Sequence, residues 1–359
     1  MSRYSRFITP RNKIFKQRLY FLLEALIVFL ITFVLLLYPT YFIYLINEST
    51  RVIISIVYNF VRALMIIIAI VLGLILSNFI LQSQKRKIVL EEDVNPSVKF
   101  INLFNVKKSN LKYQFLYGVL ILFLVFIPLD FLTYLFVPEM LNYQAYSLGV
   151  SGENSLNSYF LETYMIFLIS VIIIQFSVAI YEEALNRGFI ANRGSEYFNN
   201  MSAVMMSAFF FGLGHFAYIL YPGSAAVSVI FPLIWFFQSF FIGIILAMIL
   251  IRKRWIIPGI IAHALNNIIT AQAIWNFLQG NDFFLVAFYL YFPLLVTSVI
   301  LLIWQLPRIK EGLKIGIKHF SKYFKNDPKL KETTTDKVIR ILLDFLFGLI
   351  IYGLGIILI

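Results

Sequence analysis

The chain has 359 residues, of which 60% are hydrophobic and 13% are charged, and its mean hydropathy is +0.85. Soluble domains have about half apolar and about a quarter charged residues, so the composition excludes an ordinary soluble domain and indicates a polytopic membrane protein. The absence of cysteine excludes disulfides, a thiol nucleophile and thiolate metal ligands. The net charge of +12 would suit a nucleic-acid-binding protein, so the positions of the charges must decide between these classes.

Nine apolar runs are long enough to cross a bilayer, which takes about 20 residues in a helix. We therefore predict an all-α polytopic membrane helix bundle with about nine transmembrane helices. The first run follows a basic N-terminal stretch, but it is too long for the apolar part of a signal peptide and is predicted to be retained. In chain order the runs cover 19–46, 52–81, 113–138, 158–190, 201–221, 225–251, 255–277, 284–306 and 338–359.

The basic residues gather in alternate loops. One basic residue, Arg51, occurs in the other alternate loops, which lie near 47–51, 139–157, 222–224 and 278–283. By the positive-inside rule this pattern predicts a cell-membrane protein with its N-terminus in the cytoplasm and its C-terminus outside. The basic charge is then topological, and its predicted partners are membrane lipids and not nucleic acid. The basic set of segments holds 28 of the 30 Lys and Arg residues, in 1–18, 82–112, 187–200, 252–254 and 307–340.

The hydrophilic segments divide the chain into four predicted regions. The last region contains GLKIGIKHFSKYFK (312–325), in which apolar residues recur at helical spacing. This spacing predicts an amphipathic helix on the inner membrane face, and a solvated basic linker is the alternative. The regions are 1–112, two spans and a basic cytoplasmic loop; 113–154, the third span and an outer loop; 155–306, the membrane core that carries the motifs below; and 307–359, a basic segment and the last span.

Polar side chains occur within three of the predicted spans. Such groups are costly in lipid, so they mark candidate functional sites. The stretches are YEEALNRGFI (181–190), FFFGLGHFAYIL (209–220) and GIIAHALNNIIT (259–270). The candidates among their polar residues are Glu182, Glu183, His215, His263, Asn266 and Asn267.

The depth of these residues predicts that they meet. With about 1.5 Å of rise per residue, Glu182 and His263 lie about 12 and 13 Å from the cytoplasmic ends of their spans. His215 lies about 20 Å into its span by the same rise. We therefore predict one polar pocket in the cytoplasmic half of the bilayer.

Local spacing distinguishes the two glutamates. Glu183 and Arg187 are four residues apart on a helix, so the arginine can neutralise this carboxylate. Glu182 points about 100° away, where it can serve as a general base. His263 and Asn267 share a helix face that can hold a water, a metal or a substrate carbonyl, whereas Asn266 is rotated off that face.

The remaining charges within the spans are predicted to be structural. Glu24 and Arg62 lie at similar depths on neighbouring spans and are expected to pair. Asp130, beside Pro128, is expected to cap a kink or to reach the outer interface. Asp344 lies near the cytoplasmic end of the last predicted span.

The motifs of three known classes of intramembrane protease match this sequence poorly. A metalloprotease with the H-E-x-x-H motif is excluded because no histidine is followed by glutamate. The letters GVSG (149–152) match the G-x-S-G of rhomboid-like serine proteases, but they lie in a polar outer loop. Presenilin-like enzymes need an aspartate after G-x-G, where GLGH (212–215) has a histidine.

A glutamate-histidine form remains, and here the sequence resembles the CPBP (CAAX prenyl protease and bacteriocin-processing) family, also called Abi. The family pattern is E-E-x-x-x-R, F-x-x-x-H and H-x-x-x-N on successive membrane helices. In this chain it stands as EEALNR (182–187), FGLGH (211–215) and HALNN (263–267), and the resemblance covers about 155–305.

The resemblance implies an intramembrane endopeptidase that hydrolyses a peptide or membrane-protein substrate. It implies that Glu182 activates water as general base and that Asn267 stabilises the oxyanion. His215 and His263 would position the water or a metal. Zinc or another divalent metal held by Glu182, His215 and His263 is one form of this site, and metal-free hydrolysis is the other. Supporting roles fall to Glu183 and Arg187.

The composition is typical of bacteria and favours roles in peptide or bacteriocin maturation or in self-immunity. This preference rests on family analogy. The alternative function is a non-proteolytic membrane scaffold, regulator or immunity factor with the same fold. A secondary transporter would require an inverted repeat, and the sequence contains no convincing internal repeat.

Overall fold

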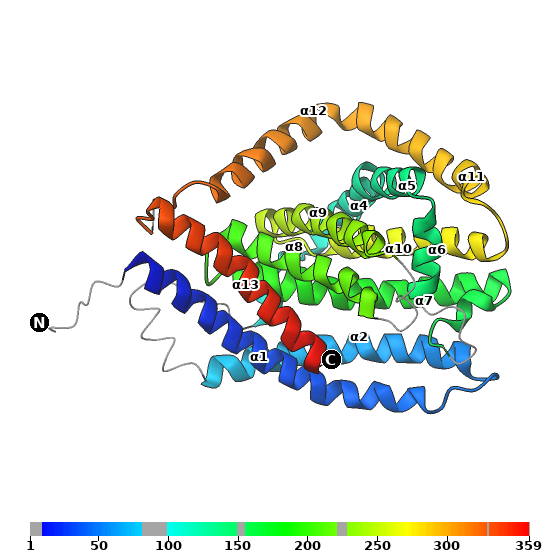
Figure 1. The fold of residues 1–359 in the computed structure, drawn as a ribbon, viewed down its shortest axis with the longest axis horizontal. Coiled ribbons are helices and arrows are strands. Elements are labelled where there is room, and N and C mark those ends of the chain that lie inside the picture. The colour runs from blue at the N-terminus through cyan, green and yellow to red at the C-terminus, as the bar shows by residue number, and fades with distance from the viewer. Residues whose placement is uncertain (1–8, 81–98, 149–154, 221–227, 329, 359) are drawn as a thin grey trace, which may run out of the picture.

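The computed structural model describes residues 9–80, 99–148, 155–220, 228–328 and 330–358 (Figure 1). These residues form helices and connecting turns, without strands. Nine helical stretches in the described part are long and apolar enough to cross a membrane, which confirms the predicted all-α bundle. The GVSG letters and most of the predicted loop 82–112 lie outside the described residues.

Several spans are composed of more than one helical element. The main helices are α1 (Pro10–Ile43), α2 (Arg51–Ile80), α4 (Lys108–Ile121), α5 (Ile127–Phe136), α6 (Glu139–Ser147), α7 (Tyr164–Glu183), α8 (Asn200–Phe216), α9 (Ile230–Lys253), α10 (Ile257–Leu278), α11 (Phe283–Val286), α12 (Phe292–Tyr323) and α13 (Thr334–Leu358). The π-helical elements are η2 (Leu122–Phe126), η4 (Ala184–Arg193) and η7 (Ala287–Tyr291), and the 3₁₀ turns are η1 (Phe100–Leu103), η3 (Ser158–Leu161) and η5 (Ala217–Leu220).

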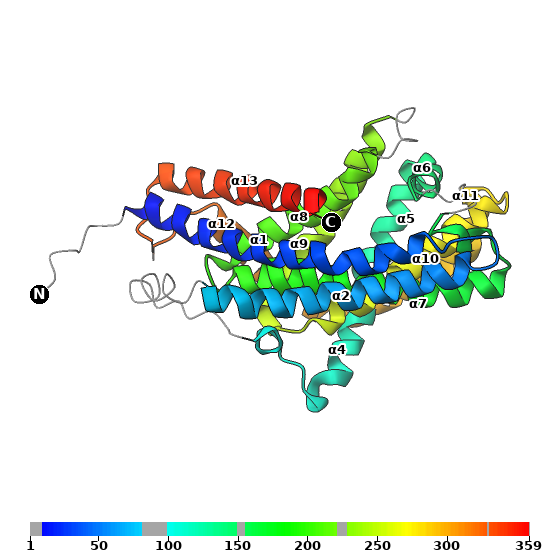
Figure 2. The same ribbon diagram turned by 90° about the horizontal axis from the view of Figure 1, so that it is seen from below.

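Helices α7, α8, α9 and α10 form the centre of the bundle. Helix α8 packs on α9, and α7 packs on α10, while α2 covers the other side of α7. Helices α1 and α13 lie side by side at one edge in both ribbon views (Figures 1 and 2). The terminal helices therefore pack onto the region that carries the polar motifs.

Two helices extend beyond the apolar runs predicted for their spans, because polar residues continue the helix in each case. Helix α1 begins at Pro10, well before the predicted start, because Thr9 caps it and proline is favoured in the first turn. Helix α12 continues through Pro307 to Tyr323, so residues 308–323 are helical and do not form the alternative linker. Figure 1 shows α12 bowed over the bundle, as expected for a helix that contains a proline.

The C-terminal half of α12 is amphipathic and exposed. Lys310, Lys314, Lys318 and Lys322 recur every four residues and are all exposed, which aligns them on one face. The neighbouring side chains Leu313, Ile317 and Phe320 are 59%, 67% and 37% exposed. The predicted amphipathic helix is therefore present, and its contact with lipid stays a prediction.

The sequence predicted that Glu24 pairs with Arg62, but its partner in the structure is Arg193. Arg193, at the end of η4, donates from Nε to Glu24 at 2.6 Å and from Nη2 at 3.1 Å, and Tyr197 also donates to this carboxylate. Glu24 and Arg193 are both fully buried. Arg62 instead lies over the ring of Tyr181, 5.0 Å from its centroid. The choice of partner depends on how η4 packs beside α1. The depth of a residue along its span does not reveal this packing.

Asp344 joins three helices in a second buried network. Its carboxylate accepts hydrogen bonds from Arg18 Nε at 2.8 Å and from the Tyr323 hydroxyl at 2.9 Å. Arg18 also donates to Ser202 at 3.2 Å. This network fixes α1, α12 and α13 against α8, so the structural role predicted for Asp344 agrees with its contacts.

Asp130 lies in the interior and does not reach the outer interface. It is 3% exposed and accepts hydrogen bonds from Gln238 at 2.5 Å and Thr270 at 3.1 Å. Asn266 lies next to it. These contacts link α5 to α9 and α10.

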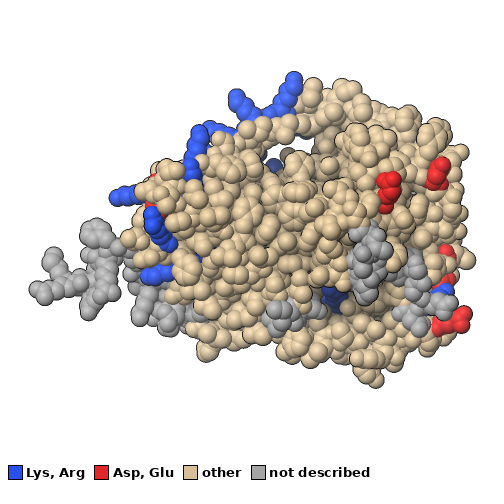
Figure 3. Space-filling view, in the orientation of Figure 1, with Lys and Arg blue, Asp and Glu red and all other residues tan. Residues whose placement is uncertain are grey.

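Charged side chains on the visible surface separate along the bundle axis (Figure 3). Most of the Lys and Arg side chains lie near the end that carries the N-terminus and along α12, whereas most of the Asp and Glu side chains lie at the opposite end. This separation follows the loop charges in the sequence and is typical of a membrane protein whose two ends face different compartments.

Candidate active site

The two adjacent glutamates lie where α7 changes from α-helix to the π-helix η4. Asn186 donates its side-chain amide to the backbone carbonyl of Glu182 at 2.8 Å, and Ser207 on α8 donates to the backbone carbonyl of Asn186 at 2.6 Å. These side chains satisfy carbonyls that a regular α-helix would pair with backbone N–H groups, which favours the wider turn. Single π turns often occur at functional sites.

Glu183 is the buried glutamate of the pair and is 0% exposed. Its Oε1 lies 3.1 Å from Arg187 Nη1 and 3.1 Å from His263 Nδ1. The predicted pairing of Glu183 with Arg187 is therefore confirmed. The Arg187 guanidinium also lies over the Phe211 ring, 4.1 Å from its centroid, so this cation is held by a carboxylate and an aromatic face.

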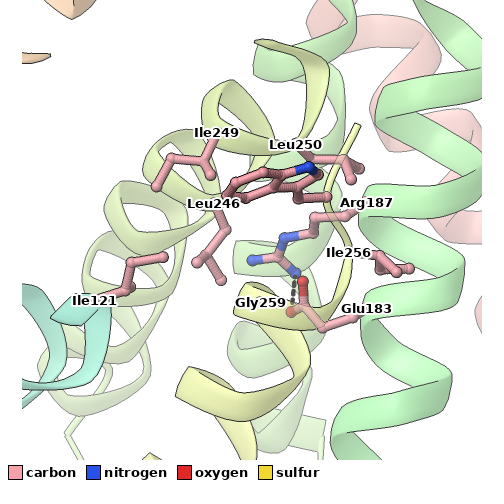
Figure 4. A pocket seen from close by; sticks show the side chains of 9 residues that line it. Ile121, Glu183, Arg187, Leu246, Ile249, Leu250, Ile256 and Gly259 are labelled. Atoms are coloured by element: carbon pink, nitrogen blue, oxygen red, sulfur yellow. Dashed lines mark ion pairs between the residues drawn. The ribbon is translucent and has the colours of Figure 1, made fainter. Parts of the chain in front are cut away.

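Helix α10 approaches Glu183 closely through Gly259. A Cβ atom at this position would lie 2.6 Å from Glu183 Oε2, which no side chain tolerates without movement. Figure 4 shows Glu183 and Arg187 facing each other within a small, mainly apolar pocket beside Gly259. The pocket is lined by Ile121, Glu183, Arg187, Leu246, Ile249, Leu250, Trp255, Ile256 and Gly259.

Glu182 is the accessible glutamate, with 27% of its side chain exposed. Its Oε2 lies 3.5 Å from His263 Nε2, longer than a normal hydrogen bond but within ion-pair distance. His263 therefore contacts Glu183 through one ring nitrogen and Glu182 through the other, and the ring is 4% exposed. Because α10 carries the histidine, the packing of α7 on α10 assembles this group.

His215 lies one aromatic ring away from this cluster. The Phe211 ring contacts both histidines, with centroid distances of 4.7 Å to His215 and 5.6 Å to His263. His215 Nδ1 lies 3.0 Å from the Phe211 carbonyl, and the imidazole packs against Trp235 at 5.2 Å. A neutral ring that donates from Nδ1 keeps a lone pair on Nε2 for water or another donor.

Asn267 lies one helical turn beyond His263 on α10. Its Nδ2 donates to Gln175 Oε1 on α7 at 3.1 Å. Gln175 in turn donates from Nε2 to the hydroxyl of Tyr159 at 3.4 Å. Asn266 points to the Asp130 cluster instead, as its rotation off this face predicted.

The structure brings together four of the six predicted residues directly, namely Glu182, Glu183, Arg187 and His263. The sequence interpretation missed Phe211 as the ring between the histidines and Gln175 as the partner of Asn267. Gln175 had a detectable signal, because it is a polar residue within an apolar run, two helical turns before Glu182.

A metal site requires at least three converging ligands for zinc. Within the described ranges, no three His, Asp or Glu side chains form a group that could hold a metal ion. Both nitrogens of His263 face carboxylates, and His215 lies across the Phe211 ring. The donor set Glu182, His215 and His263 is thus not assembled in the described residues, and a metal requirement stays a prediction.

Fold and site together define a polytopic all-α membrane protein with a glutamate-histidine centre between two of its spans. Residues 164–269 match the family described as type II CAAX prenyl endopeptidase Rce1-like. This segment contains all six predicted site residues, and the match confirms the resemblance to the CPBP family of CAAX proteases. No curated protein and no solved structure matches the chain significantly. The match supports the interpretation of this protein as a CAAX-type protease that acts in a membrane.

Proposed function

We propose that the protein is an intramembrane endopeptidase that cleaves a peptide bond with a water activated by Glu182. The contact between Glu182 and His263 carries this proposal, because it joins an accessible carboxylate to a buried imidazole at 3.5 Å. Neighbouring Glu183 is already neutralised by Arg187. Of the two carboxylates, Glu182 is therefore the one available to accept a proton.

The contacts of the cluster support this assignment. Both nitrogens of His263 face carboxylate oxygens, at 3.1 Å from Glu183 and 3.5 Å from Glu182. Arg187 lies 3.1 Å from Glu183, and a cation beside a buried carboxylate reduces the cost of burying it in a membrane. His263 holds Glu182 in place while the second carboxylate oxygen remains available to water.

The proposed reaction is a hydrolysis with two proton transfers. Glu182 takes a proton from the water as the oxygen bonds to the carbonyl carbon of the substrate, and the carbonyl oxygen becomes an oxyanion. Asn267 donates an N–H to this oxyanion. Glu182 then returns the proton to the amide nitrogen as the C–N bond breaks, which releases a new amine and a new carboxyl end.

We also propose a position of the site in the bilayer, a class of substrate and a biological role. The basic residues near one end of the bundle support a site in the cytoplasmic half of the bilayer. The substrate would be a peptide or membrane protein that enters from lipid. Among the roles open to such an enzyme, we favour maturation of a peptide or bacteriocin, or self-immunity.

The test compares wild type with Glu182→Gln, purified in detergent and mixed with a peptide library extracted from membranes. Mass spectrometry would identify new peptide ends. We expect wild type to produce ends that fall by about 100-fold or more in the variant, as for loss of a general base. Lys325→Gln, an exposed change in the described part of the chain, serves as the matched control.

A parallel sample with a chelator decides the metal question. Loss of activity that zinc restores would indicate a metal, and unchanged activity would indicate hydrolysis by protein groups. Identical peptides from wild type and Glu182→Gln would contradict the proposal and favour the non-proteolytic scaffold or immunity factor.

A further inference from the structure

Polar contacts connect α7 and α10 at two levels, and only one level involves the predicted base. Glu182 and Glu183 meet His263 at 3.5 and 3.1 Å, and Gln175 meets Asn267 at 3.1 Å. Gln175 and Glu182 are on one face of α7 because seven residues make nearly two turns, and His263 and Asn267 are separated by one turn on α10. The two levels are thus successive contacts along the same helix pair.

Gln175 accepts the hydrogen bond, which determines how the Asn267 amide is oriented. A side-chain amide can present either its oxygen or its nitrogen. Since Oε1 of Gln175 can only accept, Asn267 must turn Nδ2 toward it. This nitrogen has a second N–H, which remains available for a substrate oxygen.

Tyr159 contacts the other end of the Gln175 amide. The Gln175 Nε2 donates to the Tyr159 hydroxyl at 3.4 Å. Tyr159 is 1% exposed and stacks on Phe160 with a centroid distance of 4.8 Å, so its hydroxyl has a fixed position. The chain of contacts therefore runs from a rigid tyrosine through Gln175 to Asn267.

We propose that Gln175 is a positioning residue that, through its hydrogen bond to Asn267, aims the remaining amide N–H of Asn267 at the oxyanion of the substrate. The inference rests on the proposed function. Gln175 does not touch the substrate; it acts through Asn267, and Tyr159 acts through Gln175. Outer partners of this type typically contribute about 10- to 100-fold to activity.

The test is a double-mutant cycle on the full chain, with activity on the peptide cleaved by wild type. Gln175→Met removes the acceptor at nearly constant volume. We expect kcat to fall about 10- to 100-fold, while KM and the melting temperature stay close to wild type. In the Asn267→Ala background the same change should alter kcat less than about twofold, because residues that act as one unit are not additive.

A purely structural role would not produce this pattern. If Gln175→Met lowers kcat equally in both backgrounds, or has no effect in wild type, the inference is overturned although the proposed function stands. If Gln175→Met fails to fold, Tyr159→Phe replaces it and is expected to lower kcat less and to show the same loss of effect with Asn267→Ala. Failure of the proposed function is a separate result: Glu182→Gln would then be as active as wild type, and both proposals would fall.

The cysteine-free sequence allows an independent check of the contact itself. Cysteines placed at both 175 and 267 should be crosslinked by a short bifunctional thiol reagent, whereas a pair at 175 and 266 should not, since Asn266 lies near Asp130. Crosslinking of the second pair alone would overturn the inferred alignment of the two helices.

Discussion

The Nδ1 atom of His263 lies 3.1 Å from Oε1 of Glu183, and the same oxygen lies 3.1 Å from Arg187. One carboxylate oxygen therefore contacts both an imidazole and a guanidinium within the bundle. This arrangement fixes the histidine ring, so that its other nitrogen faces Glu182 at 3.5 Å. The buried glutamate orients the site and the accessible one is left for the proposed chemistry.

Replacing Gly259 with alanine should disturb this arrangement without removing any functional group. The new Cβ would lie 2.6 Å from Glu183 Oε2, so the carboxylate must shift, which disturbs the contacts of its Oε1 with His263 and Arg187. We expect cleavage to fall about 10-fold or more, with a stability cost of about 1–3 kcal/mol. Peptide cleavage and thermal unfolding in detergent would measure both.

The control for this change is Gly353→Ala on α13, where a Cβ would have no atom within 4 Å. It should leave cleavage unchanged and raise helix stability by about 0.5–1 kcal/mol. Wild-type activity in Gly259→Ala would show that the position of Glu183 does not matter.

The buried pair formed by Glu24 and Arg193 should dominate the stability of the contact between α1 and η4. Breaking a buried ion pair by removing one partner costs about 3–5 kcal/mol, so Glu24→Gln should lower the melting temperature strongly. Arg62→Gln should cost less because Arg62 contacts an aromatic ring instead of Glu24. Equal effects in thermal unfolding experiments, with strong coupling between Glu24→Gln and Arg62→Gln, would instead favour the pair that the sequence predicted.

The membrane orientation can be tested with single cysteines, because the chain has none of its own. Glu48, Gln279 and Lys325 are all exposed. With the N-terminus in the cytoplasm, cysteines at 48 and 279 should react with a membrane-impermeant maleimide in intact cells. A cysteine at 325 should react only after permeabilisation, and the opposite labelling pattern would reverse the topology.

The lysine face of α12 should bind anionic lipid headgroups. Each lysine near a negative membrane surface contributes about 1 kcal/mol. Anionic phosphatidylglycerol should therefore raise the melting temperature of detergent-purified wild type more than phosphatidylcholine does. Changing Lys310, Lys314, Lys318 and Lys322 to glutamine should remove this difference, whereas changing them to arginine should preserve it. An undiminished difference in the glutamine variant would assign the lipid effect to another surface.

The sequence alone determined the features that depend on neighbouring residues. Nine spans follow from runs of apolar residues, and the separation of charge follows from the loops between them. The pairing of Glu183 with Arg187 could also be predicted, because residues four apart on a helix meet whatever surrounds them. The family motifs identified the glutamates, histidines and asparagine of the candidate site.

Only the tertiary structure decided which helices face each other. Partner choice between distant residues depends on helix packing, and depth along the membrane leaves rotation and neighbours undetermined. Glu24 therefore pairs with Arg193 and not with Arg62, and the Phe211 ring separates His215 from His263. The packing of α7 on α10 placed both carboxylates on His263 and aligned Gln175 with Asn267.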